Sequence, residues 1–428
     1  MHHPRASRAS RAGARVLGMV AAAVLVACSG GSGTTPTQPS QPTTSTTARS
    51  DDGALLIGAV LPTVGAASEI GVSMTEALEL GIGEINHAGG VNGHPVRLIL
   101  REEGGNSATA ALAVRSLIQL GADAIIGPTS SPDLLATLGT AVEAGVLTCG
   151  PTASALALDA FPDKGLFFRT VPSDSLQAQA IARVVESSGS SAAAVVYLDD
   201  NYGRPFAEAT RAAIAHEGTT VTDFIGFTSG ETSISQAVAA VVEARPQVVV
   251  VVADAVTGPA IINAIDSASS RLTTFVVNDA VRRPNASAQP FASNLGSRVV
   301  GVSPLAHANS AVFLSALQQV KPGATGLFAH NAYDCLNIIA LAAVAAGSDR
   351  ATAIAGEIPS VTATGTRCSS FIDCSASLAA QRNINYDGPG GNLSIDASGE
   401  MESAVFERFT FDVNGRDVAD GLVRIGEG

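Results

Sequence analysis

The sequence predicts an α/β protein made of two doubly wound, Rossmann-like lobes. Apolar strands alternate with amphipathic helices between residues 55 and 277, and repeated β-α units are typical of doubly wound sheets. The strands Ala193–Val196 and Val248–Val252 are apolar on both faces, as parallel strands covered by helices on both sides are. The chain has 428 residues, which is enough for two domains of ordinary size.

The first 27 residues are predicted to be a cleaved signal peptide. Four arginines lie between residues 5 and 15 without an acidic residue, and the apolar run Val16–Ala27 follows. This run would form a helix of about 18 Å, too short to cross a hydrocarbon core of about 30 Å. It ends in Leu25-Val26-Ala27-Cys28, which resembles the lipobox of bacterial lipoproteins. We therefore expect lipidation of Cys28; the alternative is an ordinary signal peptide with an incidental cysteine.

Residues 28–53 are predicted to link this lipid to the folded body. From Ser29 to Ser50 the chain consists mainly of Ser, Thr, Pro, Gln and Gly, a composition that cannot bury enough apolar surface to fold and acts as a flexible tether. A diacylglycerol on Cys28 would supply the two chains that stable membrane anchoring needs. The expected location is the extracytoplasmic face of the cell membrane.

The first predicted lobe begins with the apolar strand Leu55–Val60 and the helix Ile70–Ala88. Apolar residues recur along this helix on one face, including Met74, Leu78 and Ile85, which is the helical period. Strands and helices then alternate. The strands are Pro95–Leu100, Asp123–Ile126 and Gly145–Cys149, and the helices are Ser107–Leu120 and Ser131–Ala144.

The β-α rhythm restarts at residue 174 and predicts the second lobe. Buried strands again carry runs of Val, Ile and Ala, which favour a parallel sheet. The helices are Asp174–Ser187, Arg204–His216, Ser233–Glu243 and Thr257–Ala268, and the strands are Ala192–Leu198, Thr220–Ile225, Gln247–Ala253 and Thr273–Val277.

The charge balance excludes some partners. The formal net charge is −13, and removal of the four signal-peptide arginines takes it to −17. Lys164 and Lys321 are the only lysines. An acidic chain without a basic patch is not expected to bind nucleic acid or an anionic membrane surface.

The sequence contains little that indicates catalysis. It has no G-x-S-x-G, H-E-x-x-H, G-x-G-x-x-G or G-x-x-x-x-G-K-[ST] motif, so we expect neither an enzyme nor a bound cofactor. No Cys/His cluster indicates a metal site. His330 begins a predicted helix and is a candidate pocket residue; the alternative is a capping or surface histidine.

Four cysteines remain after Cys28. Cys368 and Cys374 are six positions apart in a predicted polar loop, and outside the cytoplasm this spacing suits a local disulfide rather than two free thiols. Cys149 ends a strand and Cys335 lies on a predicted helix. Each is expected to be a buried, small apolar residue, and a bridge between them stays open as the alternative.

Turns that follow the strands are the expected ligand site, because ligands of open parallel sheets bind at the carboxyl ends of the strands. These turns are rich in Gly, Ser, Thr and Asp, and their hydroxyls, amides and helix N-termini suit a carboxylate. They are Leu61–Gly65, Gly127–Ser131, Gly150–Ser154, Asp199–Gly203, Asp254–Thr257 and Asn278–Arg282.

Several motifs, in the same order over residues 54–428, resemble those of the solute-binding proteins for branched-chain amino acids. They are Ile85-Asn86-His87-Ala88-Gly89-Gly90-Val91-Asn92-Gly93 (I-N-x-x-G-G-[IV]-x-G), Gly127-Pro128-Thr129-Ser130-Ser131 (G-P-x-x-S), Phe168-Arg169-Thr170-Val171-Pro172-Ser173-Asp174 with Gln177 (F-R-T-x-P-x-D-x-x-Q), Asn201-Tyr202-Gly203, and Tyr386-Asp387-Gly388-Pro389-Gly390-Gly391 with Ile395–Glu400.

The resemblance implies the type 1 periplasmic-binding fold, in which three hinge strands join two lobes. Crossings are expected near Val171–Asp174, Val300–Leu305 and Ser403–Phe406. Lobe 1 would hold residues 54–172 and 304–403, and lobe 2 residues 173–303 and 404–428. The family traps a small molecule, here an amino acid or similar solute, between the lobes and docks on a membrane ABC permease. We expect a monomer.

The resemblance also implies roles for individual residues. Ser131 matches the serine that binds the ligand carboxylate, with an ordinary helix cap as the alternative. Thr152-Ala153-Ser154 matches a second binding turn, and Tyr202 a tyrosine from lobe 2. Asp279 falls near the acid that pairs with the ligand ammonium, and Ile70 where a bulky pocket wall is common.

Two further points bear on function. Glu102-Glu103 stands where the family has paired aspartates, which we expect to be a surface effect. A sensory or interaction lipoprotein on the same fold is the alternative function, and a hydrolase is a more distant one. A transcription regulator is disfavoured because an export signal precedes the folded body.

Overall fold

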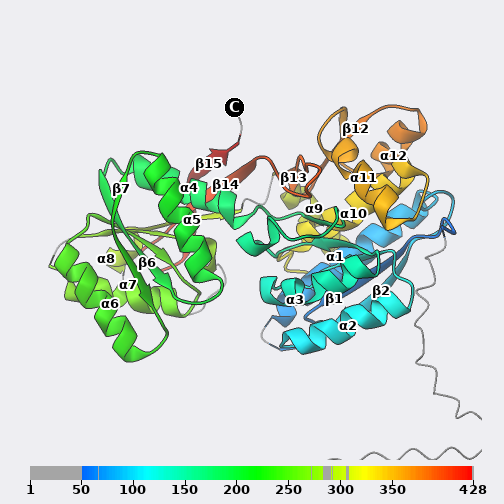
Figure 1. The fold of residues 1–428 in the computed structure, drawn as a ribbon. Coiled ribbons are helices and arrows are strands. Elements are labelled where there is room, and N and C mark those ends of the chain that lie inside the picture. The colour runs from blue at the N-terminus through cyan, green and yellow to red at the C-terminus, as the bar shows by residue number, and fades with distance from the viewer. Residues whose placement is uncertain are drawn as a thin grey trace, which may run out of the picture. The chain divides into compact units, whose positions relative to one another are not determined.

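The computed structural model describes residues 51–426 apart from Ala66, Arg271, residues 283–290, Ala292 and residues 305–307. The predicted signal peptide, Cys28 and most of the predicted tether therefore lie outside the described residues. Figure 1 shows the order of the elements along the chain.

The first sheet has five parallel strands in the order β2-β1-β3-β4-β5. Each strand before β5 is followed by a helix or helical turn, as the sequence predicts. The strands are β1 (Leu56–Leu61), β2 (Arg97–Glu102), β3 (Ala124–Ile126), β4 (Leu147–Gly150) and β5 (Phe167–Arg169), and the helices are α1 (Ser68–His87), α2 (Ser107–Gln119) and α3 (Ser131–Glu143), with a short 3₁₀ turn at Leu156–Leu158.

Helices cover both faces of this sheet because β1 is apolar on both sides. Leu56 and Val60 pack with residues of α2 and α3, whereas Ile57 and Ala59 pack with α1 and with later helices. Those later elements come from far along the chain and lie beside α1 (Figure 1). They are α9 (Ala308–Val320), α10 (Ala329–Ala346), α11 (Ala351–Thr362), α12 (Phe371–Ala379) and the small sheet of β11 (Thr366–Cys368), β12 (Ile384–Gly388) and β13 (Gly391–Asn392).

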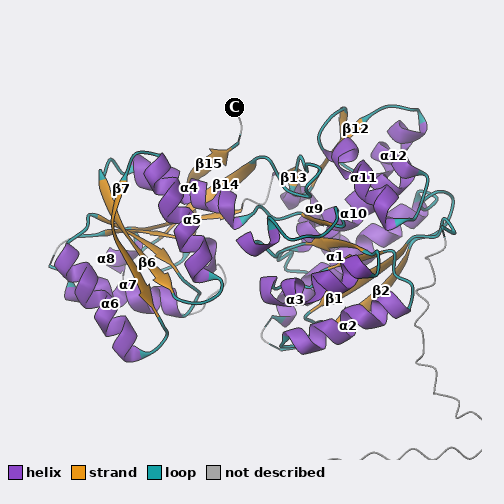
Figure 2. Cartoon of the chain, viewed as in Figure 1, coloured by secondary structure: helices purple, strands orange, loops and turns teal. Residues whose placement is uncertain are grey.

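The second sheet has seven strands in the order β15-β14-β10-β9-β8-β6-β7. Five are parallel, and β14 and β15 close one edge as an antiparallel pair (Figure 2). The strands are β6 (Ala192–Leu198), β7 (Thr220–Phe227), β8 (Val248–Val252), β9 (Thr274–Val277), β10 (Val299–Pro304), β14 (Ala404–Phe411) and β15 (Asp417–Ile425), and the helices are α4 (Asp174–Ser187), α5 (Gly203–His216), α6 (Glu231–Ala244), α7 (Thr257–Ala268) and α8 (Ser293–Gly296), with a 3₁₀ turn at Asp279–Val281.

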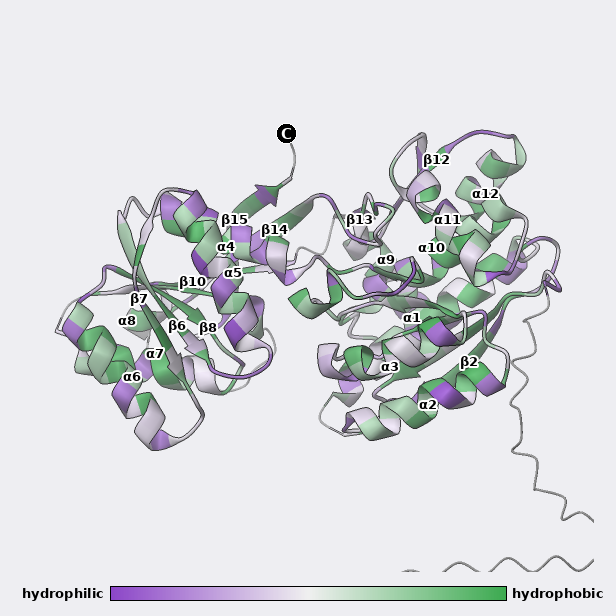
Figure 3. Cartoon of the chain, in the orientation of Figure 1, coloured by the Kyte–Doolittle hydropathy of each residue, from purple (hydrophilic) through white to green (hydrophobic). Residues whose placement is uncertain are grey.

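The all-valine strand β8 shows why this sheet is covered on both sides. All five of its side chains are buried. Val249 and Val251 pack with α6 and α7, while Val250 and Val252 pack in the cluster that contains α4 and α5. The hydropathy colouring follows this arrangement, with apolar strands inside two-toned helices (Figure 3). Burial of both faces is the expected use of a continuous apolar run.

The chain passes between the two sheets three times, so the predicted two-lobe fold is confirmed. The first passage runs from β5 to α4, the second leaves β10, and the third enters β14. The lobe limits given above stay predictions. Within the described ranges no single helix is long and apolar enough to span a membrane, although the bent pair α10 and α11 meets that length and composition together.

Both remaining cysteine pairs are bonded. Cys368 and Cys374 form a disulfide with Cα atoms 5.3 Å apart, but they lie on β11 and α12 rather than in a loop. The interpretation of Cys149 and Cys335 as separate apolar residues was wrong, because they form a second disulfide with Cα atoms 5.9 Å apart. This bond joins β4 to α10, and both residues are fully buried.

We expect the two disulfides to differ in their contribution to stability. Cys149 and Cys335 are 186 positions apart and Cys368 and Cys374 only 6. By loop-closure entropy, Cys149→Ala with Cys335→Ala should cost about 5 kcal/mol, whereas the matched pair Cys368→Ala with Cys374→Ala should cost about 2 kcal/mol. Urea unfolding of the two double variants measures the difference, and equal losses would contradict it.

Candidate functional site

The turn after β3 is already filled by a carboxylate from the protein itself. Glu103 is 2% exposed and accepts hydrogen bonds from the amides of Thr129 (3.0 Å) and Ser130 (3.2 Å). The expectation that Glu102-Glu103 is a surface effect was therefore wrong for Glu103. Because Glu103 already binds these two amides, the turn has fewer free N–H donors for a ligand than its sequence suggests.

Ser131 retains donor capacity beside this turn. The cap of α3 is Ser130, whose side chain accepts from Asp133, so Ser131 is not the capping residue. The Ser131 hydroxyl oxygen accepts from the Ala155 amide at 3.2 Å, which leaves its hydrogen available. Its position at the N-terminus of a 13-residue helix favours an anion.

The second turn, Thr152-Ala153-Ser154, lies next to the first. Thr152 donates its hydroxyl to the Thr129 carbonyl at 2.8 Å, and Ala153 is fully buried. The side chain of Ser154 instead reaches a group of acidic and phenolic side chains, where it interacts with Asp174 and Tyr202. Only Ser154 of this turn therefore links to the next feature.

That feature, the acidic pole, consists of Ser154, Asp174, Tyr202 and Asp279. These residues come from four separate places: the turn after β4, the first residue of α4, the residue before α5, and the turn after β9. Tyr202 donates to Asp174 Oδ1 at 3.5 Å, and Gln177 donates from one amide nitrogen to Asp279 Oδ1 and to the Val302 carbonyl, both at 3.0 Å.

The acidic pole is electrostatically unfavourable without a cation. Burial, with the neighbouring charge of Asp279, raises the pKa of Asp174 to about 7. The pKa of Asp279 is also raised, chiefly by burial. Burial, followed by the two carboxylates, raises the pKa of Tyr202 well above its ordinary value. Asp174 Oδ2 is buried and has no hydrogen-bond partner among the described residues.

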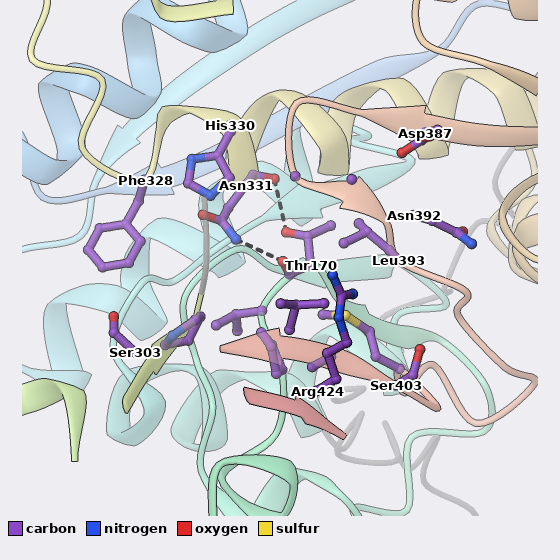
Figure 4. Close-up of a pocket in the computed structure, with 18 of the residues that line it drawn as sticks. Thr170, Ser303, Phe328, His330, Asn331, Asp387, Asn392, Leu393, Ser403 and Arg424 are labelled. Atoms are coloured by element: carbon purple, nitrogen blue, oxygen red, sulfur yellow. Dashed lines mark hydrogen bonds between the residues drawn. The ribbon is translucent and has the colours of Figure 1, made fainter. Parts of the chain in front are cut away.

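A cavity of about 520 Å³ lies at the crossings between the sheets and is called the hinge cavity here (Figure 4). Of the predicted site residues, Asp279 and His330 line it. Burial lowers the pKa of His330 to about 4, so its imidazole is neutral near pH 7. The wall also includes Thr170, Ser303, Phe328, Asn331, Leu393, Met401, Ser403 and Leu422.

Buried polar contacts hold the walls of the hinge cavity. Thr170 donates its hydroxyl to the Asn331 carbonyl at 2.9 Å, and Asn331 donates its amide to the Thr170 carbonyl at 2.7 Å (Figure 4). Asp334 accepts from the Tyr386 hydroxyl at 2.8 Å and from the Gly390 amide at 2.7 Å. A side chain on Gly388 or Gly390 would collide with Asp334, which accounts for these two glycines.

The structure thus separates the predicted site residues into groups. Ser154, Tyr202 and Asp279 meet in the acidic pole, and Asp279 and His330 line the hinge cavity. Ser131 and Thr152 lie in the two turns Gly127–Ser131 and Gly150–Ser154, which are called the polar turns. Ile70 is half-buried in the first turn of α1 and packs against the main core, outside the residues that line the cavity. No group of three metal-ligating side chains occurs within the described ranges.

Comparison with known proteins identifies the fold family. The sequence model of the periplasmic binding proteins matches residues 55–406. The chain belongs to the periplasmic binding protein family. This agrees with the motifs and with the two sheets joined by three crossings.

Curated members of the periplasmic binding protein family are similar to this chain at moderate identity. Leu/Ile/Val-binding protein homolog 3 of Brucella melitensis is 29% identical over 46% of this chain. The match spans 53% of that protein, so the chain matches about half the length of this relative. BasB of Halobacterium salinarum, a substrate-binding protein of a chemotactic signal transduction system, is 25% identical over 80% of this chain and 83% of its own length.

Solved structures of periplasmic binding proteins share the fold. LivJ of Streptococcus pneumoniae, in complex with isoleucine, has a TM-score of 0.67 at 20% identity and covers 87% of this chain and 100% of its own. A solute-binding protein of R. palustris in complex with benzoate has a TM-score of 0.65 at 18% identity and covers 88% and 98%. At these identities the likeness shows the fold alone.

Sequence reasoning missed Asp174, Phe328 and Asn331 as site residues. A signal for Asp174 existed, since it is the acidic position of the F-R-T-x-P-x-D-x-x-Q motif, and Gln177 of the same motif binds Asp279. Phe328 carried no local signal: it has a positive φ of 53° before α10. Its place in the cavity wall depends on how α10 approaches the crossings.

We expect Asp174→Asn to stabilise the ligand-free protein at high pH. A folded-state pKa raised from 3.8 to about 7 costs stability above pH 7 and nothing below pH 3.8, so the gain should be about 2–4 kcal/mol at pH 8 and small near pH 4. Denaturant unfolding at both pH values measures it. Asp254→Asn is the control with opposite sign, because hydrogen bonds from Val256 and Thr257 lower the pKa of Asp254. A gain at pH 4 as large as at pH 8 would contradict the assignment.

Proposed function

We propose that this protein is an extracytoplasmic solute-binding lipoprotein that captures a small amino acid or related solute between its lobes and delivers it to an ABC importer. The observation that carries the proposal is the acidic pole, which gathers two carboxylates beside hydroxyls of the polar turns. Groups of both kinds close together suit a ligand with an ammonium and a carboxylate.

The carboxylate of such a ligand would bind at the polar turns. Ser131 has a hydroxyl hydrogen to donate and lies at the start of α3. Among the described residues, the amides of Thr152, Ala153 and Ser154 donate to no other group. By accepting hydrogen bonds from these donors, a ligand carboxylate would regain the hydrogen bonds to water that it loses on binding.

The ammonium would bind at Asp279, beside Tyr202. An ammonium removed from water is costly unless it is paired. The direction of the Asp279 pKa, raised chiefly by burial, supports a cation as the partner of its carboxylate. The hinge cavity would hold the remainder of the ligand. Its border includes the neutral Phe328, His330 and Leu393 and the charged Arg367, Asp387 and Arg424.

Ligand binding would favour the closed arrangement of the lobes. Ser131 and Ser154 follow strands of the first sheet, while Tyr202 and Asp279 follow strands of the second. A ligand that contacts both sets is bound better when they approach, and this difference in affinity shifts the population. The closed form would then dock on a permease.

Three features support the cellular setting. The N-terminal segment has the parts of a lipoprotein signal, two disulfides indicate an oxidising compartment, and the curated relatives carry the names of substrate-binding proteins. No step in this proposal uses catalysis, a metal or a cofactor. The protein would act as a monomer held at the membrane by lipid on Cys28.

Asp279→Ala should weaken binding of an amino acid by about 2 kcal/mol or more, the scale of losing one partner of a buried charge pair. Titration calorimetry with the amino acid that binds best in a thermal-shift screen measures the loss. Asp223→Ala is the matched control on β7. Unchanged affinity in Asp279→Ala would remove Asp279 from the site.

Cys28→Ala should release the full-length protein from the membrane, because the anchor would be lost. Cell fractionation and detergent phase separation compare this variant with wild type and with Ser29→Ala, which should stay at the membrane. If Cys28→Ala remained in the membrane fraction, lipidation at Cys28 would not be the anchor.

A further inference from the structure

We propose that Asp174 and Asp279 form a carboxyl pair that holds one proton in the ligand-free protein and exchanges it for the cationic head of the ligand. This inference rests on the proposed function and names its ligand class. The ligand carries a positive charge at neutral pH, as a primary ammonium does, and simple carboxylic acids are excluded.

The first evidence is the environment of Asp174. It is 1% exposed, Oδ2 has no hydrogen-bond partner in the described part of the chain, and Oδ1 receives a long bond of 3.5 Å from Tyr202. A buried ionised carboxylate needs strong donors or a cation to offset its desolvation. Asp174 has only two hydroxyls, those of Ser154 and Tyr202, and an arginine that is bound elsewhere, so its carboxyl holds a proton when the site is empty.

The second evidence is the set of groups around the pair. Asp279 faces Asp174 from the turn after β9, Tyr202 from the start of α5, and Ser154 from the turn after β4. Two arginines lie near the pair. Arg169 on β5 interacts with Asp174, but its guanidinium is bound to Glu400 and Asp159. Arg282 interacts with Asp279, but it is bound to Glu407 and Asp417.

Gln177 gives its amide to Asp279 and to Val302, not to Asp174. The groups that interact with Asp174 are therefore one carboxyl, two hydroxyls and a cation committed elsewhere. The raised pKa of Asp174, about 7, agrees with this geometry. Only a cation brought by the ligand supplies the missing charge.

The exchange conserves charge. In the empty site Asp174 holds the proton and Asp279 carries the one negative charge. When an ammonium docks at Asp279, Asp174 gives its proton to water, and two carboxylates then face one cation. Binding thus releases up to one proton, and affinity rises with pH, by at most tenfold per unit, until about pH 7.

The same balance sets selectivity among ligands of this fold, which include isoleucine in one solved structure and benzoate in another. Benzoate is an anion without a cationic head. It cannot displace the proton from the carboxyl pair, and it would bring a further negative charge to the acidic pole. The pair therefore favours an amino acid or amine over an aromatic or aliphatic acid.

The test uses titration calorimetry on the full chain without its signal peptide, from pH 5.5 to 8.5, in phosphate and in Tris. These buffers differ in heat of ionisation, so the comparison counts protons. The probes are the common amino acid that binds best in a thermal-shift screen, its deaminated acid, and benzoate. Wild type should release about 0.5–1 proton at pH 6.5 and gain about tenfold in affinity between pH 5.5 and 7.5, whereas both acids should bind at least 100-fold more weakly than the amino acid.

Asp174→Asn should still bind the amino acid but release no proton and lose the pH dependence. Asp163→Asn is the matched control, because Asp163 also has a raised pKa but lies outside the acidic pole; it should behave as wild type. Proton release that persists in Asp174→Asn would overturn the inference and leave the proposed function standing. If only the acids bound, the inference would be overturned together with the amino-acid ligand of the proposed function. Should Asp174→Asn fail to fold, absence of proton release by wild type would be decisive against the inference.

Discussion

The buried guanidinium of Arg169 is the constraint on which the crossings depend. Arg169 ends β5 and is fully buried. It donates to Glu400, at 2.8 Å from Nε, and to Asp159. Removing a partner from such a buried network leaves an uncompensated charge and costs about 3–5 kcal/mol. Because Glu400 precedes β14 and Asp159 accepts from the α4 cap Ser173 at 2.9 Å, one side chain ties the first and third crossings together.

Further contacts join the network around Arg169 to α10. The reciprocal bonds of Thr170 with Asn331 and the disulfide between Cys149 and Cys335 join the end of the first sheet to the start of that helix. The acidic pole is built directly beside this network. The burial of Asp174 without adequate partners lowers the stability of the folded protein. The neighbouring contacts nevertheless hold Asp174 in position. Local rules fail at functional sites in this way when the surrounding structure compensates.

The regular elements before residue 277 were predictable because their signals are local. Helix α4, strand β6 and helix α7 have the predicted bounds, and most others differ by one to three residues at an end. Strand β7 runs on to Phe227, whose side chain is buried among α6 and β8. This two-residue extension depends on packing, so the local sequence pattern of the strand does not predict it.

The site was only partly predictable for the same reason. The turns at the strand ends follow from sequence, since ligands of open parallel sheets bind there. The resemblance to the family implied Ser154, Tyr202 and Asp279 within those turns. Two other features depend on which turns meet in the folded chain. Glu103 binds the amides of Thr129 and Ser130, and Asp174 is buried with few partners.

The sequence by itself determined the two-lobe α/β fold, its family and the residue types at the strand ends, because hydrophobic period and turn chemistry act over a few residues. Only the tertiary structure decided that Cys149 bonds Cys335 across 186 positions, that Arg169 joins two crossings, and that the buried Asp174 lies near the half-buried Asp279. Each of these is a long-range pairing, and its energy exists only after distant segments have been brought together.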